Sequence, residues 1–344
     1  MKEIKFVKTI LLFCVSSAIL FACQKENQAS STKYDVSVKI IPADVIAPFT
    51  YEVDPGDLTK IMDGYKIRVA LRVYDKDGFL VEKKTGYLQN YDAISNFTVS
   101  LSSGVYTLLA TTDIVEYNGS KVKFEYWNFG KGANNSDDQK LSELRIVDNG
   151  YIGSMGLKSL GVTSTKISVA DAPFDTSIRV KPACALAVVF FKNIHTNSEI
   201  KTLEVETSKL GDYLFFDGTG QYDMSFKWPE KNYYFRLYSI DVADYSKYNS
   251  IYSYIYLLPG DKYELKARYT STDDTQGYLV DGSKVLNFKK GEEYEIIVDC
   301  KDSSTGSPSF TINKVGDVKA SSGPTCDACL ASCSGTLIME NVSE

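Results

Sequence analysis

Apolar and polar residues alternate with a period of two along much of the chain from Tyr34 onward. The alternation is clearest in residues 35–40, 65–73 and 97–101. This period places successive side chains on opposite faces of a β-strand. In residues 65–73 the intervening positions include Lys66, Arg68 and Arg72. We therefore expect that strand to pack one face on a core and to expose its cationic face to water.

Short turn signals separate the predicted strands. Residues 75–78, with the sequence Asp-Lys-Asp-Gly, predict a hairpin turn before a return strand that contains Phe79 and Val81. A calcium loop is the alternative, but the acidic positions expected further along such a loop are missing. Residues 216–220 predict a second hairpin turn.

One phrase recurs along the chain. A turn glycine is followed by a tyrosine, a leucine and an alanine in residues 104–110 and again in residues 260–267, and residues 291–298 nearly repeat it. A tyrosine at the start of a strand can bury its ring while its hydroxyl bonds the backbone. The repeat predicts two similar β-sandwich domains in tandem; chance recurrence of common strand sequences is the alternative.

Residues 184–191 are apolar on both faces and predict a central strand, in which Cys184 is a small buried hydrophobe. The segment 170–173 (Ala-Asp-Ala-Pro) is the expected domain boundary. The predicted fold is all-β, with antiparallel sandwich domains at 34–170 and 171–300. A linker and cysteine-containing tail follow at 301–344, with one extra strand over 310–318.

Composition supports the β prediction and limits the partners. The 344 residues include 24 Tyr and 17 Phe, which favour half-buried pleated surfaces. The net charge of -6 argues against a nucleic-acid partner, which would require a basic face.

The first 22 residues predict a lipoprotein signal peptide. Lys2, Lys5 and Lys8 precede an apolar run over 9–21, which is too short to span a bilayer, and Ala22 precedes Cys23. We expect cleavage before Cys23 and acylation of Cys23 by palmitate-type chains, with residues 23–33 as the lipidated cysteine and flexible tether. A plain signal peptide or a single anchor helix is the alternative.

Two aromatic segments are candidate recognition surfaces. Trp127 and its aromatic neighbours could stack a sugar or dock a partner, or fill the end of a sandwich. Residues 233–256 are dense in tyrosine among small polar residues, a composition typical of contact surfaces, although ordinary strands are the alternative. The candidates in this second segment are Tyr245, Tyr248, Tyr252 and Tyr254.

The tail carries the cysteines Cys326, Cys329 and Cys333. Their spacing could hold a metal or an iron–sulfur centre only with a further ligand from elsewhere. An exported protein meets an oxidising compartment, so disulfide formation is the favoured interpretation, with free thiols as another. We predict no metal and no cofactor.

Motifs of catalysis are missing from the sequence. The chain has one histidine, His195, and contains no nucleophile elbow, zinc-protease motif or phosphate loop. We therefore predict that the protein is not an enzyme. A hydrolase built on two carboxylates brought together by folding would leave no local motif, and this alternative stays open.

Three features together resemble the fimbrillin-type lipoproteins of Bacteroidia, especially the minor subunits that anchor fimbriae. They are the residues around Cys23, the segment 73–81 and the segment 101–110. The resemblance implies transthyretin-like sandwich domains, lipid-anchored display at the surface of the outer membrane, and assembly with fimbrial subunits by strand addition. Stalk members of that family are trimmed after an early arginine, whereas the first arginine here is Arg68, within a predicted strand. This favours an anchor or accessory adhesive role; a surface glycan-binding lipoprotein is the alternative.

Overall fold

The structure is a computed structural model that describes residues 32–42, 64–90, 93–130, 140–149, 159–194, 197–227, 235–245, 248–301, 304, 306–317 and 338–341. The predicted signal peptide, Cys23, the tether up to residue 31, His195 and the tail cysteines lie outside the described residues. The structure describes the backbone, but not the side chains, of Tyr245, Tyr248, Tyr252 and Tyr254.

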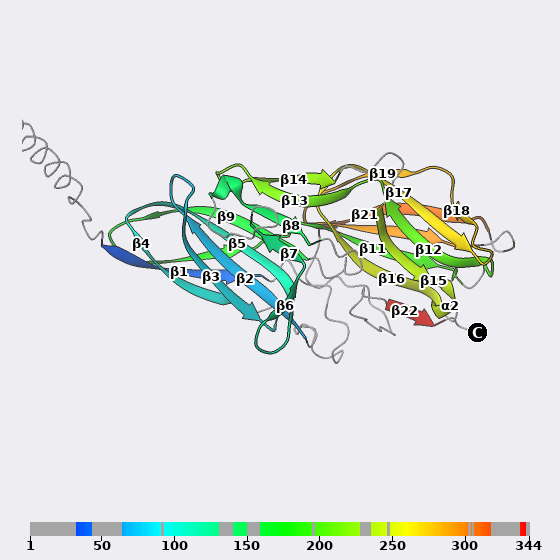
Figure 1. Ribbon diagram of the computed structural model, residues 1–344, viewed down its shortest axis with the longest axis horizontal. Coiled ribbons are helices and arrows are strands. Elements are labelled where there is room, and N and C mark those ends of the chain that lie inside the picture. The colour runs from blue at the N-terminus through cyan, green and yellow to red at the C-terminus, as the bar shows by residue number, and fades with distance from the viewer. Residues whose placement is uncertain are drawn as a thin grey trace, which may run out of the picture.

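The described residues form an all-β fold of several sheets, as predicted (Figure 1). Their helical content is the 3₁₀ turn η4 (Leu141–Glu143) and the four-residue α2 (Val242–Tyr245). No helix among the described residues has the length and the apolar character needed to cross a membrane.

Seven strands form two sheets in the first half of the chain. β1 lies between β10 and β4, while β2 lies between β3 and β5, and β9 pairs with the other side of β5. The bounds are β1 (Lys33–Ile41), β2 (Tyr65–Tyr74), β3 (Leu80–Leu88), β4 (Ser95–Ser102), β5 (Gly104–Tyr117), β9 (Leu160–Val169) and β10 (Phe174–Arg179).

Seven strands of the second half repeat this pairing in the same chain order. β11 lies between β20 and β16, while β12 lies between β15 and β17, and β19 pairs with β17. The bounds are β11 (Ala185–Lys192), β12 (Ile200–Thr207), β15 (Phe235–Asp241), β16 (Tyr248–Leu257), β17 (Gly260–Ser271), β19 (Lys284–Phe288) and β20 (Glu292–Asp299). The predicted central strand is therefore β11, and Cys184 beside it is buried.

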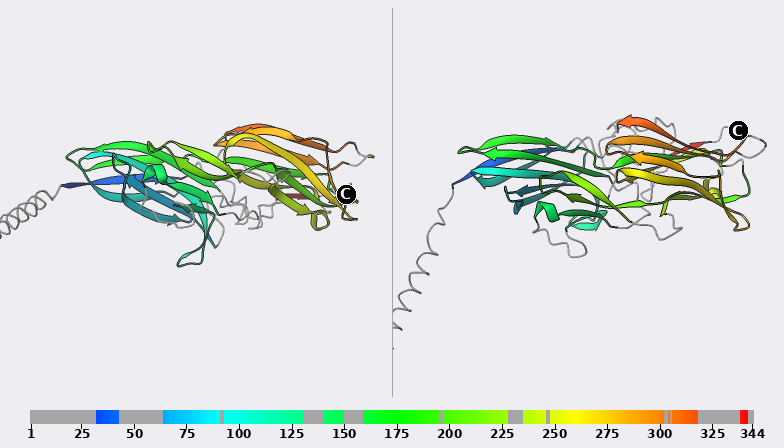
Figure 2. Two further views of the ribbon diagram at one scale, coloured as in Figure 1. Left: turned by 45° about the horizontal axis from the view of Figure 1, so that its top comes forward. Right: turned by 90° about the horizontal axis from the view of Figure 1, so that it is seen from above.

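The remaining strands are additions to these two sets. β18 extends β17, β21 extends β20 and β22 extends β16, while the insertions of the two halves share one sheet in the order β14-β13-β8-β7. Figure 1 shows this shared sheet where the two halves meet, and Figure 2 shows the elongated molecule from two further sides. The bounds are β6 (Val122–Glu125), β7 (Trp127–Phe129), β8 (Arg145–Asp148), β13 (Leu210–Phe216), β14 (Tyr222–Lys227), β18 (Gln276–Tyr278), β21 (Ser309–Asp317) and β22 (Ile338–Asn341).

The expectation of purely antiparallel sheets is wrong. β1 pairs with β10 in parallel, and β11 pairs with β20 in parallel. A parallel pair needs a long crossover, and each of these pairs joins the first strand of its set to the last. The intervening strands supply that crossover, so the alternating sequence pattern could not distinguish the two directions.

Two apolar cores fill the halves. The first is built on inward residues of β1, β2 and β5, and the second on those of β11, β12, β17 and β20. Leu214 and Phe216 of β13 and Leu258 also belong to the first core, so the insertion of the second half packs on the first half. The domain boundary at 170–173 stays a prediction.

The cationic face of β2 is buried, which corrects the expectation that it faces water. Arg68 and Arg72 have exposed fractions of 8% and 2%. The Phe129 ring of β7 lies against both guanidinium groups, at 4.9 Å and 4.6 Å from its centroid. Arg68 also binds Asp113 of the neighbouring β5 through two hydrogen bonds. The inserted strand and a buried carboxylate therefore replace water at this face.

The predicted turns are confirmed. The Asp75 carboxylate accepts the N–H groups of Asp77 and Phe79, both at 2.9 Å, and so closes the turn before β3. In the recurring phrase, the Tyr106 hydroxyl donates to the Ser102 carbonyl and the Tyr263 hydroxyl donates to the Leu258 carbonyl.

Candidate functional site

The edge of β16 is the first candidate site. β11 pairs with β16 on one side, and β22, from the far C-terminal part of the chain, pairs with it on the other. The β22 register covers only Tyr248 to Tyr252. Among the described strands, none pairs with the remaining residues 253–257 on that side. We call this side of β16, with residues 248–257, the β16 edge.

The tyrosine-dense segment builds this edge. Tyr248, Tyr252 and Tyr254 lie in β16, whereas Tyr245 lies in α2 just before it. The register pairs Tyr252 with Ile338 and Tyr248 with Asn341. Three of the four candidate recognition residues therefore lie along the strand that pairs with β22. A role in recognition stays a prediction for them.

Trp127 does not form an exposed aromatic platform. Its exposed fraction is 2%, and its neighbour Tyr126 is buried to the same degree. The Trp127 carbonyl accepts a hydrogen bond from Arg68 at 2.9 Å. The aromatic cluster packs over the buried arginines of β2 and so has the core-filling role that was the alternative interpretation.

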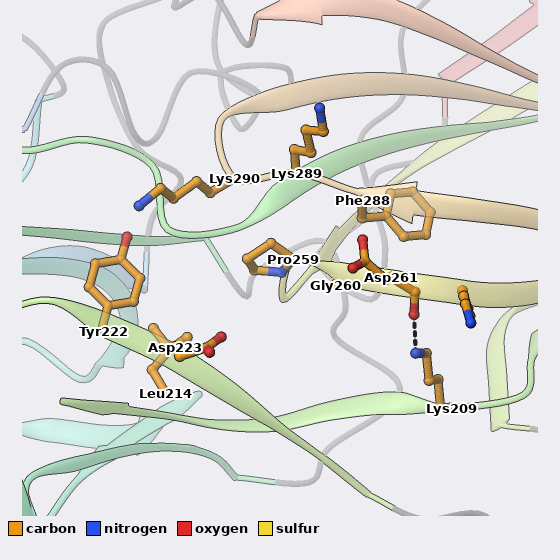
Figure 3. A pocket seen from close by; sticks show the side chains of 11 residues that line it. Lys209, Leu214, Tyr222, Asp223, Pro259, Gly260, Asp261, Phe288, Lys289 and Lys290 are labelled. Atoms are coloured by element: carbon orange, nitrogen blue, oxygen red, sulfur yellow. Dashed lines mark hydrogen bonds between the residues drawn. The ribbon is translucent and has the colours of Figure 1, made fainter. Parts of the chain in front are cut away.

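A cavity of about 570 Å³ between the β13–β14 insertion and the body of the second half is the second candidate site. The β13–β14 insertion forms one wall, and the turns before β17 and β20 form the other (Figure 3). We call it the junction cavity. Its lining residues are Lys209, Leu214, Tyr222, Asp223, Pro259, Gly260, Asp261, Lys262, Phe288, Lys289 and Lys290.

The junction cavity is basic in a chain that is acidic overall. Four lysines and two aspartates line it, which leaves two positive charges, against a net charge of -6 for the whole chain. The Lys209 ammonium donates to the Asp261 carbonyl, the contact drawn in Figure 3. Burial lowers the pKa of Lys209, against the opposing effect of Asp261. The Lys290 ammonium lies 4.8 Å from the centroid of the Tyr222 ring.

Sequence reasoning missed the junction cavity, although a signal for it was present. The recurring glycine–tyrosine phrase carries Asp261 and Lys262 at one turn, and Lys289 and Lys290 stand just before the next. Lysines clustered at two turns of one repeated phrase predict a basic end of the sheet. Their meeting with β13 and β14 depends on the packing of an insertion that no local pattern reveals.

Carboxylates also gather on β12. Glu204 and Glu206, both buried, bind the same side chain, Arg268 of β17. This arrangement holds the two carboxylates as partners of one cation. The hydrolase alternative required two carboxylates in a cleft; these two lie outside the junction cavity, whereas Asp223 and Asp261 line it.

The described residues contain no cluster of three or more His, Cys, Asp or Glu side chains that could hold a metal ion. Cys326, Cys329 and Cys333 lie outside the described residues. Disulfide, free thiol and metal therefore stay open as interpretations of the tail.

No protein-family model matches the chain, and no curated protein matches it. Solved structures do. A candidate adhesin of Bacteroides thetaiotaomicron is 13% identical with a TM-score of 0.49, covering 85% of this chain and 100% of that one. A candidate polysaccharide-binding protein of the same species is 13% identical with a TM-score of 0.46, covering 82% and 98%. The fimbrial anchor protein Mfa2 of Porphyromonas gingivalis is 13% identical with a TM-score of 0.42, covering 83% and 99%. The chain thus resembles Bacteroidales adhesins and fimbrial proteins in fold over most of its length.

Proposed function

We propose that this chain is a cell-surface lipoprotein that serves as a fimbrial anchor or accessory adhesive subunit. Lipid on Cys23 holds it on the outer membrane, and a strand from another fimbrial subunit adds to the β16 edge. The body consists of two transthyretin-like sandwich domains. The repeated seven-strand pairing supports this description of the body.

The proposal rests on one observation: β22 already pairs with part of the β16 edge. β22 is only four residues long, and its register ends at Tyr252. A strand from a partner can form hydrogen bonds along residues 253–257 as well, and so gains backbone pairs that β22 does not make. Such a strand displaces β22, because both require the same donors and acceptors of β16.

The lipid anchor rests on the sequence. Cys23 follows a small residue at the end of a short apolar run, and the cationic residues before that run fit a lipoprotein signal. Two or more acyl chains hold a protein on a membrane where one chain does not. The first arginine, Arg68, lies in β2, and this position favours a subunit that keeps its lipid.

Affinity capture of the protein from intact outer membranes, followed by mass spectrometry, tests this function. We expect co-purification of fimbrillin-like subunits in a ladder of complexes. Cys23→Ala should release the protein from the membrane fraction, whereas Cys14→Ala, inside the signal, should leave it there. A wild-type protein recovered alone, or with transport and glycan-processing proteins, contradicts the fimbrial role and favours a glycan-binding lipoprotein.

A further inference from the structure

The junction cavity has a rigid frame. The Tyr263 hydroxyl donates to the Leu258 carbonyl at 2.7 Å and fixes the turn before β17. The Tyr294 hydroxyl accepts the N–H of Lys289 at 3.2 Å and fixes the turn before β20. Phe288 lies between the two tyrosine rings, edge to face, at 5.0 Å from each centroid. A wall held in this way keeps its shape without a ligand.

The two turns are also tied to each other. The backbone N–H of Lys262 donates to the Asn287 side chain at 2.8 Å. Lys262 adopts a φ of 58°, in the left-handed region that residues with a Cβ seldom occupy. Strain of this kind persists only where the surroundings enforce it, and it concentrates at binding sites. The frame therefore holds the Lys262 side chain at the cavity against a local preference.

Two of the cavity lysines, Lys262 and Lys290, have charges available to a ligand. Within the described part of the chain, no ion pair involves Lys262 or Lys290. Lys290 lies over the ring of Tyr222, on the opposite wall, and Figure 3 shows it extending toward that ring. Burial raises the pKa of the Tyr222 phenol, so the hydroxyl stays protonated and can donate a hydrogen bond. The two walls thus offer ammonium groups and a phenol together.

Two aspartates decide which anion fits. Asp223 and Asp261 line the same cavity as the four lysines. A polyphosphate is charged on every unit and has no hydroxyl to donate, so both carboxylates would repel it. A sugar acid carries one carboxylate and several hydroxyls, so it can pair with a lysine and donate hydrogen bonds to the aspartates. One of its hydroxyls can also accept a hydrogen bond from the Tyr222 phenol.

We propose that the junction cavity binds an acidic oligosaccharide, with the carboxylates of different uronic acid units against Lys262 and Lys290 and a sugar hydroxyl bonded to the Tyr222 phenol. The volume of about 570 Å³ lies within the range of roughly 300–1,000 Å³ that is typical of small-ligand sites. This site is separate from the β16 edge and gives the subunit a carbohydrate ligand in addition to its fimbrial partner.

Titration calorimetry of the full mature chain with trigalacturonate tests the proposal, with neutral galactotriose as the comparison probe. We expect saturable binding of the acidic probe, weakened at least about tenfold by Lys262→Gln with Lys290→Gln, because each lysine contributes a charge-assisted contact. The matched control is Lys166→Gln with Lys121→Gln, which removes two exposed charges from the first half. This control should retain the affinity.

A second pair of variants separates the ring of Tyr222 from its hydroxyl. Tyr222→Ala removes the hydroxyl and the ring that positions Lys290 and should lose most binding, whereas Tyr222→Phe keeps the ring and should lose only the hydrogen bond. Thermal melting of each variant verifies that it is folded.

Three results would overturn the proposal. They are equal affinity for galactotriose, tighter binding of triphosphate than of trigalacturonate, or an unchanged affinity in the double lysine variant. Release of new reducing ends from the probe would also contradict a binding role. None of these outcomes depends on fimbrial assembly, so the two proposals fail separately.

Discussion

Tyr106 and Tyr263 occupy equivalent places in the two halves of the chain. Each stands near the start of a long strand, and its hydroxyl donates to a backbone carbonyl of the turn before that strand, at 3.0 Å and 2.7 Å. Tyr263 is fully buried, whereas Tyr106 has an exposed fraction of 9%. The same side chain therefore fixes the same turn twice, with less access to water in the second half.

The difference in burial predicts a difference in stability. Tyr263→Phe leaves the Leu258 carbonyl without this donor, and we expect a loss of about 1–2 kcal/mol in the free energy of unfolding. Tyr106→Phe should cost less, because water can replace its hydroxyl. Urea denaturation of both variants measures the two values, and an equal or reversed order would contradict this account.

The buried pair Arg68–Asp113 is a second test. Arg68 donates to both carboxylate oxygens of Asp113, at 2.8 Å and 2.7 Å. Asp113→Ala leaves a buried guanidinium with one carboxylate less, and we expect a loss of about 3–5 kcal/mol. Replacement of both partners by apolar residues, Arg68→Met with Asp113→Leu, should restore much of that loss. The control Asp77→Ala breaks an exposed pair with Lys76 and should leave the urea midpoint unchanged.

Gly220 tests the packing of the β13–β14 insertion on the first half. It has a φ of 94°, and a Cβ at this position would lie 2.5 Å from Ser164 Oγ on β9. Gly282 has a φ of 86° but no heavy atom within 4 Å of the corresponding Cβ, so it reports the backbone cost alone. We expect Gly282→Ala to cost about 1 kcal/mol and Gly220→Ala clearly more. Equal losses in thermal melts would contradict the close contact.

The buried thiol of Cys300 should lower the stability of the fold at alkaline pH. Burial raises the pKa of its thiol from 9.0 to about 12. Between these values the unfolded thiol is ionised and the folded thiol is not, so the unfolded state binds fewer protons and stability falls as pH rises. Tyr294, whose pKa is raised to about 12 by burial and by Glu292, acts in the same direction. Urea midpoints at pH 8 and pH 10.5 should therefore differ less in Cys300→Ala than in wild type, and an unchanged difference would contradict this assignment.

The sequence pattern predicted those elements that depend only on residues close together in the chain. The turn at Asp75, the strand beside Cys184 and the hydroxyl bonds of the repeated tyrosines all follow from neighbouring residues. Arg72 shows where this reasoning fails. Its alternating position indicated a wet face, but a ring from an insertion about 57 residues later covers it. The junction cavity escaped prediction for the same reason, because it forms only where the β13–β14 insertion packs against the turns before β17 and β20.

Assembly at the β16 edge is the central claim, and a reversible lock on β22 tests it most directly. Ile251 and Met339 are opposite each other in the register of β16 and β22, within the spacing that a disulfide spans. The lock is Ile251→Cys with Met339→Cys, in a background in which Cys326, Cys329 and Cys333 are serine. The matched control, Glu295→Cys with Asn313→Cys, ties β21 to β20 at the other edge of the same sheet.

The readout is the ladder of complexes recovered from outer membranes. The account predicts that the β22 lock abolishes the ladder, that reductant restores it, and that the β21 lock leaves it intact. A ladder that forms equally well with β22 locked would show that partners do not add at the β16 edge.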